Sequence, residues 1–213
     1  MTYIKISNLE KEIKGAKLLN DISLDLESGN IYGLIGDNGS GKTMLMRAMS
    51  GLVVPNKGEV YYENQQLGKD FEFPDSLGLL IETPGFLLDY THFTNLKLLA
   101  SIKGKISDEA IRQALEKVGL DSKLKLKVRH FSLGMKQRLG IAQAIMENPE
   151  VLILDEPFNG LDTKGVDEIR ELLLALKKDG KLIVISSHQQ DNIDYLCDEV
   201  FEIAQGKLKR RIG

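Results

Sequence analysis

The segment from residue 30 to residue 51 constrains the fold more than any other part of this chain. Residues 30–35 form a compact apolar run, residues 36–43 read Gly-Asp-Asn-Gly-Ser-Gly-Lys-Thr, and residues 42–51 favour a helix that Gly51 ends. An apolar run without alternation indicates a strand that is buried on both faces. A buried strand, a glycine-rich loop and a helix in this order therefore predict an α/β fold around a parallel sheet.

The glycine-rich loop matches the pattern G-x-x-x-x-G-K-[ST] at every specified position. Glycines let successive N–H groups point inward at the N-terminus of a helix, which creates an anion site. Lys42 supplies a charge that can reach the β- and γ-phosphates, and the Thr43 hydroxyl can bind Mg²⁺. We therefore predict nucleotide binding rather than a glycine-rich turn that matches by chance. The loop alone would suit a kinase, a GTPase or a motor.

The rest of the chain shows three different patterns. Residues 3–26 alternate apolar and polar side chains, which is typical of short antiparallel strands with one solvent-facing side. Residues 83–146 have helical patterns, with Ser107 as the cap of one helix and residues 136–146 as another. Buried strands then alternate with helices, in the order 151–154, 166–178, 182–185, from about 191, and about 200–203.

These patterns predict one domain over residues 1–213, with no internal repeat and no linker rich in proline or serine. The fold class is α/β: a P-loop NTPase core with a parallel sheet, an antiparallel β subdomain and an inserted helical subdomain. We expect the core to comprise residues 1–82 and 147–213, and the helical subdomain residues 83–146.

Composition excludes several classes of protein. The 28 Lys and Arg against 31 Asp and Glu give a net charge of −3, so strong sequence-independent binding to nucleic acid is not expected. A single cysteine, Cys197, forms neither an internal disulfide nor a Cys-based zinc site. The charged start of the chain is unlike an export signal, and no apolar run approaches the roughly 18–20 residues of a membrane-spanning helix. We expect a cytoplasmic protein.

Two carboxylates follow the apolar run at 151–154. Asp155 and Glu156 come directly after it, before Pro157. A strand that ends in a carboxylate puts that charge at the carboxyl edge of a parallel sheet, where α/β proteins bind ligands. Asp155 is suited to hold Mg²⁺, and Glu156 to polarise a water molecule aimed at the γ-phosphate. A strand end followed by an ordinary polar turn is the structural alternative.

Three further segments resemble the ATP-binding subunit of ABC transporters. Residues 131–138, Phe-Ser-Leu-Gly-Met-Lys-Gln-Arg, are similar to the family's signature segment, and residues 159–162, Asn-Gly-Leu-Asp, to its dimer-contact loop. His188 follows the strand at 182–185, at the place of the family's switch histidine. A Ser-x-Gly turn or a strand-end histidine alone is more often structural, but together with the glycine-rich loop and the acidic strand these features stand in the family's order over nearly the whole chain.

The resemblance implies an ATP hydrolase that binds ATP and Mg²⁺, and in which two copies join head to tail. The signature of each copy then closes over the ATP of the other, with Ser132 and Gly134 binding in trans and Asp162 contacting the partner. It also implies these residue roles: ATP-binding Gly36, Asn38, Gly39, Ser40, Gly41, Lys42, Thr43 and Ile13; catalytic Glu156, His188 and Glu82; metal-binding Thr43, Asp155 and Glu82.

Some positions depart from the family pattern. Leu133 and Met135 stand where the signature usually has Gly and Gln. Ile13 stands where an aromatic side chain usually stacks on adenine, so that contact is expected to be apolar. Glu82 replaces the usual Gln; an amide both donates and accepts, whereas an ionised carboxylate only accepts and adds negative charge. A solvated loop acid is the structural alternative for Glu82.

Glu82 together with this signature is similar to the branch that serves bacitracin- and lantibiotic-type resistance or immunity exporters. The resemblance then implies a separate transmembrane permease subunit, a second ATP-binding subunit in a homodimer, no nucleic acid, and a place at the inner face of the cell membrane. We expect the permease to dock around residues 86–99, where apolar side chains crowd a surface loop. The alternatives are a soluble ABC-type ATPase acting on ribosomes or DNA, and a nucleotide-gated clamp that hardly hydrolyses ATP.

Overall fold

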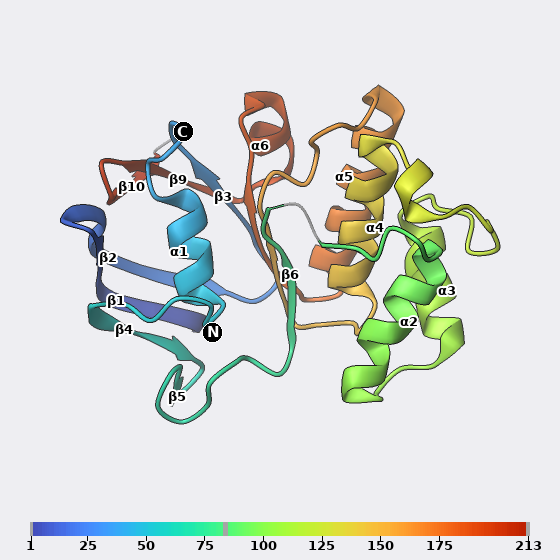
Figure 1. Ribbon diagram of the computed structural model, residues 1–213. Coiled ribbons are helices and arrows are strands. Elements are labelled where there is room, and N and C mark those ends of the chain that lie inside the picture. Colours follow the sequence, from blue (N-terminus) through green and yellow to red (C-terminus); the bar gives the residue numbers. More distant parts are fainter. Residues whose placement is uncertain (1, 83–84, 212–213) are drawn as a thin grey trace.

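The computed structural model describes residues 2–82 and 85–211, which form two sheets with helices between and beside them (Figure 1). The larger sheet has the order β10-β9-β3-β8-β7-β6, and all its neighbouring strands are parallel except β10 against β9. Its strands are β3 (Ile31–Ile35), β6 (Leu77–Leu80), β7 (Val151–Leu154), β8 (Leu182–Ser186), β9 (Glu199–Ala204) and β10 (Lys207–Arg211). The predicted α/β class with a parallel-sheet core is confirmed.

The central strands are apolar throughout because both of their faces are buried. On β7, Val151 and Ile153 join one hydrophobic cluster, whereas Leu152 and Leu154 join the other. Side chains alternate between the faces of a strand, so each face receives every second residue. Such a strand is stable only between two covering layers, which the antiparallel sheet with helix α1 (Lys42–Met49) and the remaining helices provide.

The smaller sheet is antiparallel, in the order β2-β1-β4-β5. Its strands are β1 (Thr2–Ile13), β2 (Ala16–Glu27), β4 (Lys57–Tyr62) and β5 (Gln65–Gln66). Strand β2 alternates buried and exposed residues, and its buried Leu19, Ile22 and Leu24 face α1 and the parallel sheet. The predicted alternation over residues 3–26 is therefore present, but as two long strands of 12 residues with register shifts between them.

Several of the helices begin at polar caps that the sequence contains. Ser107, Ser132 and Asp162 each accept a hydrogen bond from the backbone N–H three residues on, at the start of the third, fourth and fifth helices. These and the other helices are α2 (His92–Lys103), α3 (Asp108–Lys117), the 3₁₀ turn Val128–His130, α4 (Leu133–Ile145), α5 (Thr163–Lys178) and α6 (Gln190–Leu196). Helix α4 thus begins three residues before the predicted start at 136, because Ser132 is its cap.

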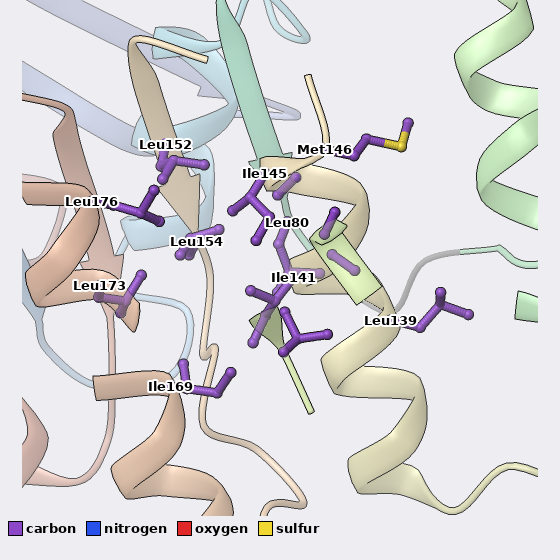
Figure 2. Packing of buried hydrophobic residues seen from close by; sticks show 14 of the residues in the cluster. Leu80, Leu139, Ile141, Ile145, Met146, Leu152, Leu154, Ile169, Leu173 and Leu176 are labelled. Atoms are coloured by element: carbon purple, nitrogen blue, oxygen red, sulfur yellow. The ribbon is translucent and has the colours of Figure 1, made fainter. Parts of the chain in front are cut away.

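Helix α4 joins the helical segment to the parallel sheet (Figure 2). Its buried Leu139, Ile141 and Ile145 belong to one cluster with Leu80, Leu152 and Leu154 of the sheet, and with Ile169, Leu173 and Leu176 of α5. The same cluster includes the buried residues of α3. Helices α2, α3 and α4 therefore share a continuous core with the sheet. The predicted division at residues 82/83 and 146/147 stays a prediction, and residues 83–84 lie outside the described residues.

Four strands were not predicted: β4, β5, β6 and β10. Strand β6 contains Gly78, which favours no strand, but a Cβ there would lie 2.1 Å from the Ala144 carbonyl oxygen, so glycine is required where α4 crosses the sheet. Strand β10 consists largely of basic residues and forms an exposed edge strand against β9, where charged side chains are tolerated. Strands β4 and β5 form a short hairpin that pairs with β1.

One expected surface residue is buried. Leu96 was predicted to belong to the apolar surface around residues 86–99, but it has no exposed surface because α2 turns it into the core. The neighbouring Leu87, Leu88 and Tyr90 are about half exposed. Within residues 2–82 and 85–211, no helix has both the length and the apolar character needed to cross a membrane.

Candidate functional site

A cavity of about 300 Å³ lies where β3, β7 and β8 end, beside the N-terminus of α1. These three strands are neighbours in the parallel sheet, so their carboxyl ends bring separate parts of the sequence together. The cavity wall contains the predicted residues Asn38, Gly39, Gly41, Lys42, Thr43, Asp155, Glu156 and His188, together with Leu18 and Met44.

The glycine-rich loop curls tightly between β3 and α1. Gly36 and Gly41 have φ of 142° and 119°, which side chains with a Cβ rarely adopt. A Cβ on Gly36 would lie 2.2 Å from the Ile203 carbonyl oxygen, and one on Gly41 would lie 2.6 Å from the Leu18 carbonyl oxygen. Glycine is therefore required at both positions, for the turn and for the close approach of the backbone.

The polar groups of this loop suit an anion. Lys42 is only 7% exposed, and its Nζ donates to the carbonyl oxygens of Gly36 and Asp37 at 2.6 and 3.1 Å. The Ser40 Oγ is buried without a hydrogen-bond partner among the described residues. A buried hydroxyl without a partner costs free energy, and a phosphate oxygen would satisfy it. The N-terminus of α1 adds a positive dipole at the same place.

Asp155 ties three elements together at the floor of the cavity. Its Oδ2 accepts a hydrogen bond from the Thr43 hydroxyl at 2.7 Å, and its Oδ1 accepts one from the Ser186 hydroxyl. A carboxylate and a hydroxyl are the hard oxygen ligands that Mg²⁺ prefers. No cluster of three His, Cys, Asp or Glu occurs within residues 2–82 and 85–211 that could hold a metal. The donors present therefore fit an ion that takes its remaining ligands from phosphate oxygens and water.

Glu156 lies beside Asp155 in an unusual backbone conformation. Its φ is 50°, in the left-handed region, which costs a residue with a Cβ about 1 kcal/mol. Its N–H donates to the Ser186 Oγ at 2.9 Å, and its carboxylate Oε2 accepts from the His188 N–H at 3.2 Å. Its other oxygen, Oε1, is buried and has no hydrogen bond among the described residues, although the imidazole Nε2 of His188 is 3.2 Å away.

Burial raises the pKa of the Glu156 carboxyl above its ordinary value, and the neighbouring Asp155 charge also raises it. The hydrogen bond from His188, the charge of its imidazole and the charge of Lys42 act in the opposite direction on this pKa. A carboxylate with a raised pKa is a stronger base than an exposed glutamate, and Glu156 lines the cavity.

Four residues predicted to act on the ATP of their own chain do not line the cavity: Gly36 and Ser40 of the glycine-rich loop, and Ile13 and Glu82. Ile13 is 41% exposed at the end of β1, whereas Leu18 of β2 lies in the cavity wall. The Glu82 carboxylate forms an ion pair with the Arg47 guanidinium on α1. The roles predicted for Ile13 at the adenine, and for Glu82 in catalysis and metal binding, stay predictions.

The residues predicted to act in trans form a separate surface. Ser132 caps α4, and its Oγ accepts from the Met135 N–H at 3.2 Å. Gly134 faces the loop after Glu156, since a Cβ on it would lie 2.7 Å from the Gly160 carbonyl oxygen. Asp162 caps α5 through a 2.9 Å bond from the Gly165 N–H. None of these three lines the cavity of its own chain, and their roles toward a second copy stay predictions.

Several residues of the site were not predicted. Ser186 is the only side chain that bonds to both Asp155 and the Glu156 N–H among the described residues, and a serine at the end of an apolar strand was an available signal. No sequence signal indicated Leu18. It belongs to the antiparallel sheet and reaches the cavity only because β2 packs against the glycine-rich loop. Arg47 looked like an ordinary helix-surface residue.

The comparisons with known proteins agree with this geometry. The family described as ABC transporter matches residues 19–159. The chain is 50% identical to an uncharacterized ABC transporter ATP-binding protein, YybJ, of Bacillus subtilis (strain 168), over 97% of this chain and 94% of YybJ. It is 38% identical to the lantibiotic transport ATP-binding protein SrtF of Streptococcus pyogenes, over 96% of this chain and 88% of SrtF. It is 42% identical to the bacitracin transport ATP-binding protein BcrA of Bacillus licheniformis, over 99% and 70%.

A solved structure supports the fold. The chain superposes with a TM-score of 0.88 on the ATP-binding cassette MJ0796, described as a dimer in a post-hydrolysis state bound to ADP and Pi. The two sequences are 24% identical, and the match covers 99% of each chain.

The raised pKa of Glu156 predicts the pH dependence of ATP hydrolysis. A general base works only when it is ionised, so kcat/KM for ATP should fall as the pH decreases through this raised pKa. The acid limb should therefore lie at a higher pH than an ordinary glutamate would give. ATP binding over the same pH range, followed with a fluorescent analogue, is the control. A limb at the ordinary value would contradict the role of Glu156.

The position of Glu82 predicts the behaviour of Glu82→Gln. Because the carboxylate lies outside the cavity and pairs with Arg47 near the surface, we expect ATP affinity and the half-saturating Mg²⁺ concentration to change less than about twofold. Stability should change by less than about 1 kcal/mol, since exposed ion pairs contribute little. A large shift in the Mg²⁺ requirement of ATP binding would instead establish Glu82 as a metal ligand.

Proposed function

The chain belongs to the ABC transporter family as an ATP-binding cassette that hydrolyses ATP, and we propose that two copies of it close around two ATP molecules to power a separate membrane subunit. The observation that carries this proposal is the cavity itself. It joins a phosphate loop, a Thr–Asp pair and a glutamate with a histidine at one edge of the sheet.

ATP binding is supported by the loop at residues 36–43. The triphosphate would take the N–H groups of the loop, the Ser40 hydroxyl and the Lys42 ammonium. Lys42 would exchange its two carbonyl partners for phosphate oxygens, which are stronger partners because they are charged. Leu18 offers an apolar contact at the same wall, and Ile13 is the proposed contact for adenine.

Thr43 and Asp155 would hold Mg²⁺, which supplies positive charge next to the phosphates. Glu156, which lines the cavity, would accept a proton from the attacking water through its carboxylate. His188 would steady Glu156 and the γ-phosphate, because its backbone N–H already orients the carboxylate and its imidazole lies 3.2 Å from Oε1. These roles account for hydrolysis at one edge of the sheet.

A second copy is needed to complete the site. Ser132 and Gly134 lie at the N-terminus of α4, whose positive dipole suits a γ-phosphate, but they do not line the cavity of their own chain. In a head-to-tail homodimer the α4 N-terminus of one copy would cover the cavity of the other, and Asp162 would lie at the contact. Closure and opening of this dimer would transmit the energy of ATP binding.

The membrane subunit would bind the apolar surface around α2. Leu87, Leu88 and Tyr90 are half exposed next to the start of this helix, and Leu98 and Ile102 are exposed on it. Apolar side chains gathered in this way favour a protein partner. The cassette would then work from the cytoplasm on the inner face of the cell membrane, with no nucleic acid as a partner.

The transported molecule would be an antimicrobial peptide or a similar amphiphile, moved outward. The support is the similarity to SrtF and BcrA, described as lantibiotic and bacitracin transport ATP-binding proteins. A soluble ABC-type ATPase or a nucleotide clamp outside transport is the alternative. It is not favoured, because these relatives match over most of their length.

Glu156→Gln tests the site and the dimer together. Removing the base should lower ATP hydrolysis by two orders of magnitude or more, and the ATP-bound dimer should persist. Size-exclusion chromatography with ATP should then give twice the monomer mass, and the monomer without nucleotide. Gln143→Met on α4, at a partly buried glutamine that does not line the cavity, is the control and should behave as the wild type. Normal turnover in Glu156→Gln would reject Glu156 as the base.

A resistance assay tests the membrane partner and the cargo. Cells that express this chain together with a candidate membrane permease subunit should tolerate more lantibiotic or bacitracin than cells that express the Glu156→Gln variant with the same subunit. Leu88→Asp should abolish this tolerance and co-purification with the membrane subunit, while ATP binding is kept. Unchanged tolerance and co-purification in Leu88→Asp would contradict the docking site, and protection against neither peptide would contradict the cargo.

A further inference from the structure

Helix α4 reaches the backbone of Glu156 through one side chain. The Gln137 Nε2 donates to the Glu156 main-chain carbonyl oxygen at 2.9 Å. A carbonyl oxygen only accepts, so the amide must present its NH₂ group here. Gln137 lies one helical turn after Gly134 on the same helix. The turn proposed to grip the partner's ATP and the residue proposed as the base are therefore connected within one chain.

The Glu156 peptide needs this support from outside. Glu156 has a φ of 50°, which residues with a Cβ adopt only when their surroundings hold them there. On one side its N–H donates to the Ser186 hydroxyl at the end of β8. On the other side the next residue is Pro157, which has no N–H. The carbonyl oxygen is thus the sole hydrogen-bonding group of the peptide between Glu156 and Pro157. It accepts from the Asn159 N–H of the following turn at 3.2 Å and from Gln137, which is its partner on α4.

The first turns of α4 are packed tightly on the elements that follow Glu156. A Cβ on Gly160 would lie 2.5 Å from the Leu133 Cγ, so this loop touches the start of α4 directly. The Arg138 Nη2 is 2.7 Å from the Glu168 Oε2 on α5, and its Nη1 donates to the Val118 carbonyl oxygen at 2.5 Å. A displacement of the α4 N-terminus would therefore be transmitted to the Glu156 peptide rather than absorbed between them.

We propose that Gln137 is a positioning residue that couples the two ATP sites of the dimer. The proposal rests on the proposed function, in which the N-terminus of α4 closes over the ATP of the other copy. When that turn closes, α4 carries Gln137, and Gln137 sets the direction of the Glu156 carboxylate in its own copy. Capture of ATP at one site thereby prepares the base at the other site.

Gln137→Met tests this connection, because methionine keeps the length of the side chain and removes the donor. We expect kcat for ATP hydrolysis to fall about tenfold, the size of effect that one lost hydrogen bond and a misplaced base can cause. The KM for ATP should change less than twofold, since Gln137 does not line the cavity. Gln143→Met makes the same change two turns later on α4, where the glutamine is partly buried and has no side-chain hydrogen bond to another described residue. It should leave kcat unchanged.

Mixed dimers separate an effect on the chain's own Glu156 from an effect on the partner's ATP. Each pairs two differently tagged copies, and Glu156→Gln in one copy leaves a single active site. In the first dimer, Gln137→Met is in the copy that keeps Glu156. In the second, Gln137→Met and Glu156→Gln are in the same copy, so the altered α4 only covers the active site. A dimer of wild type with Glu156→Gln is the reference for single-turnover hydrolysis.

We expect the first mixed dimer to hydrolyse ATP about tenfold more slowly than the reference, and the second to match it within about twofold. Equal rates in the two mixed dimers, whether slow or normal, or a loss in the second alone, would overturn the inference. Gln137→Glu, which keeps the shape but presents an acceptor to the carbonyl, should repeat the pattern and guards against a packing defect. Hydrolysis by the Glu156→Gln homodimer would overturn the proposed function itself, and with it this inference.

Discussion

The central strands of the parallel sheet are buried on both faces up to their last residues, and the rest of the structure depends on this constraint. Val151 and Ile153 pack on one side of β7 and Leu152 and Leu154 on the other, so the first polar side chain after them, Asp155, emerges at the edge of the sheet. Asp155 then bonds to Thr43 from the loop after β3 and to Ser186 from the end of β8. Hydrophobic burial thus decides where the polar chemistry collects.

This explains how much could be predicted from sequence. The apolar run at 151–154, the glycine-rich loop and the strand at 182–185 are local patterns, so the fold class and the neighbourhood of Lys42, Asp155 and His188 followed from them. Strand β6 was not predicted because it contains Gly78. Glycine is required there by the close approach of the Ala144 carbonyl oxygen on a distant helix, and not by neighbouring residues in the sequence. Strand β10 was not predicted because its basic residues give no strand pattern, and an exposed edge strand tolerates charge on both faces.

Contacts between side chains of separate helices and strands could not be predicted from sequence patterns. Leu18 reaches the cavity from the antiparallel sheet, Arg47 pairs with Glu82 across α1 and the segment after β6, and Gln137 holds the Glu156 carbonyl. Each joins residues 19 or more positions apart, and each partner alone looks like a common surface or helix residue. Such pairings depend on tertiary packing, which periodicity and residue type describe only indirectly.

The bonds from the Lys42 ammonium to the Gly36 and Asp37 carbonyls have a consequence for the timing of the reaction cycle. These hydrogen bonds stabilise the curved conformation of the loop, so the loop keeps this conformation without a bound nucleotide. Binding of a nucleotide then requires the Lys42 side chain to exchange its hydrogen-bond partners, and it requires no refolding of the backbone. A preformed binding site loses little conformational entropy when the nucleotide binds. The slow steps of the cycle should therefore be the large movements between subunits.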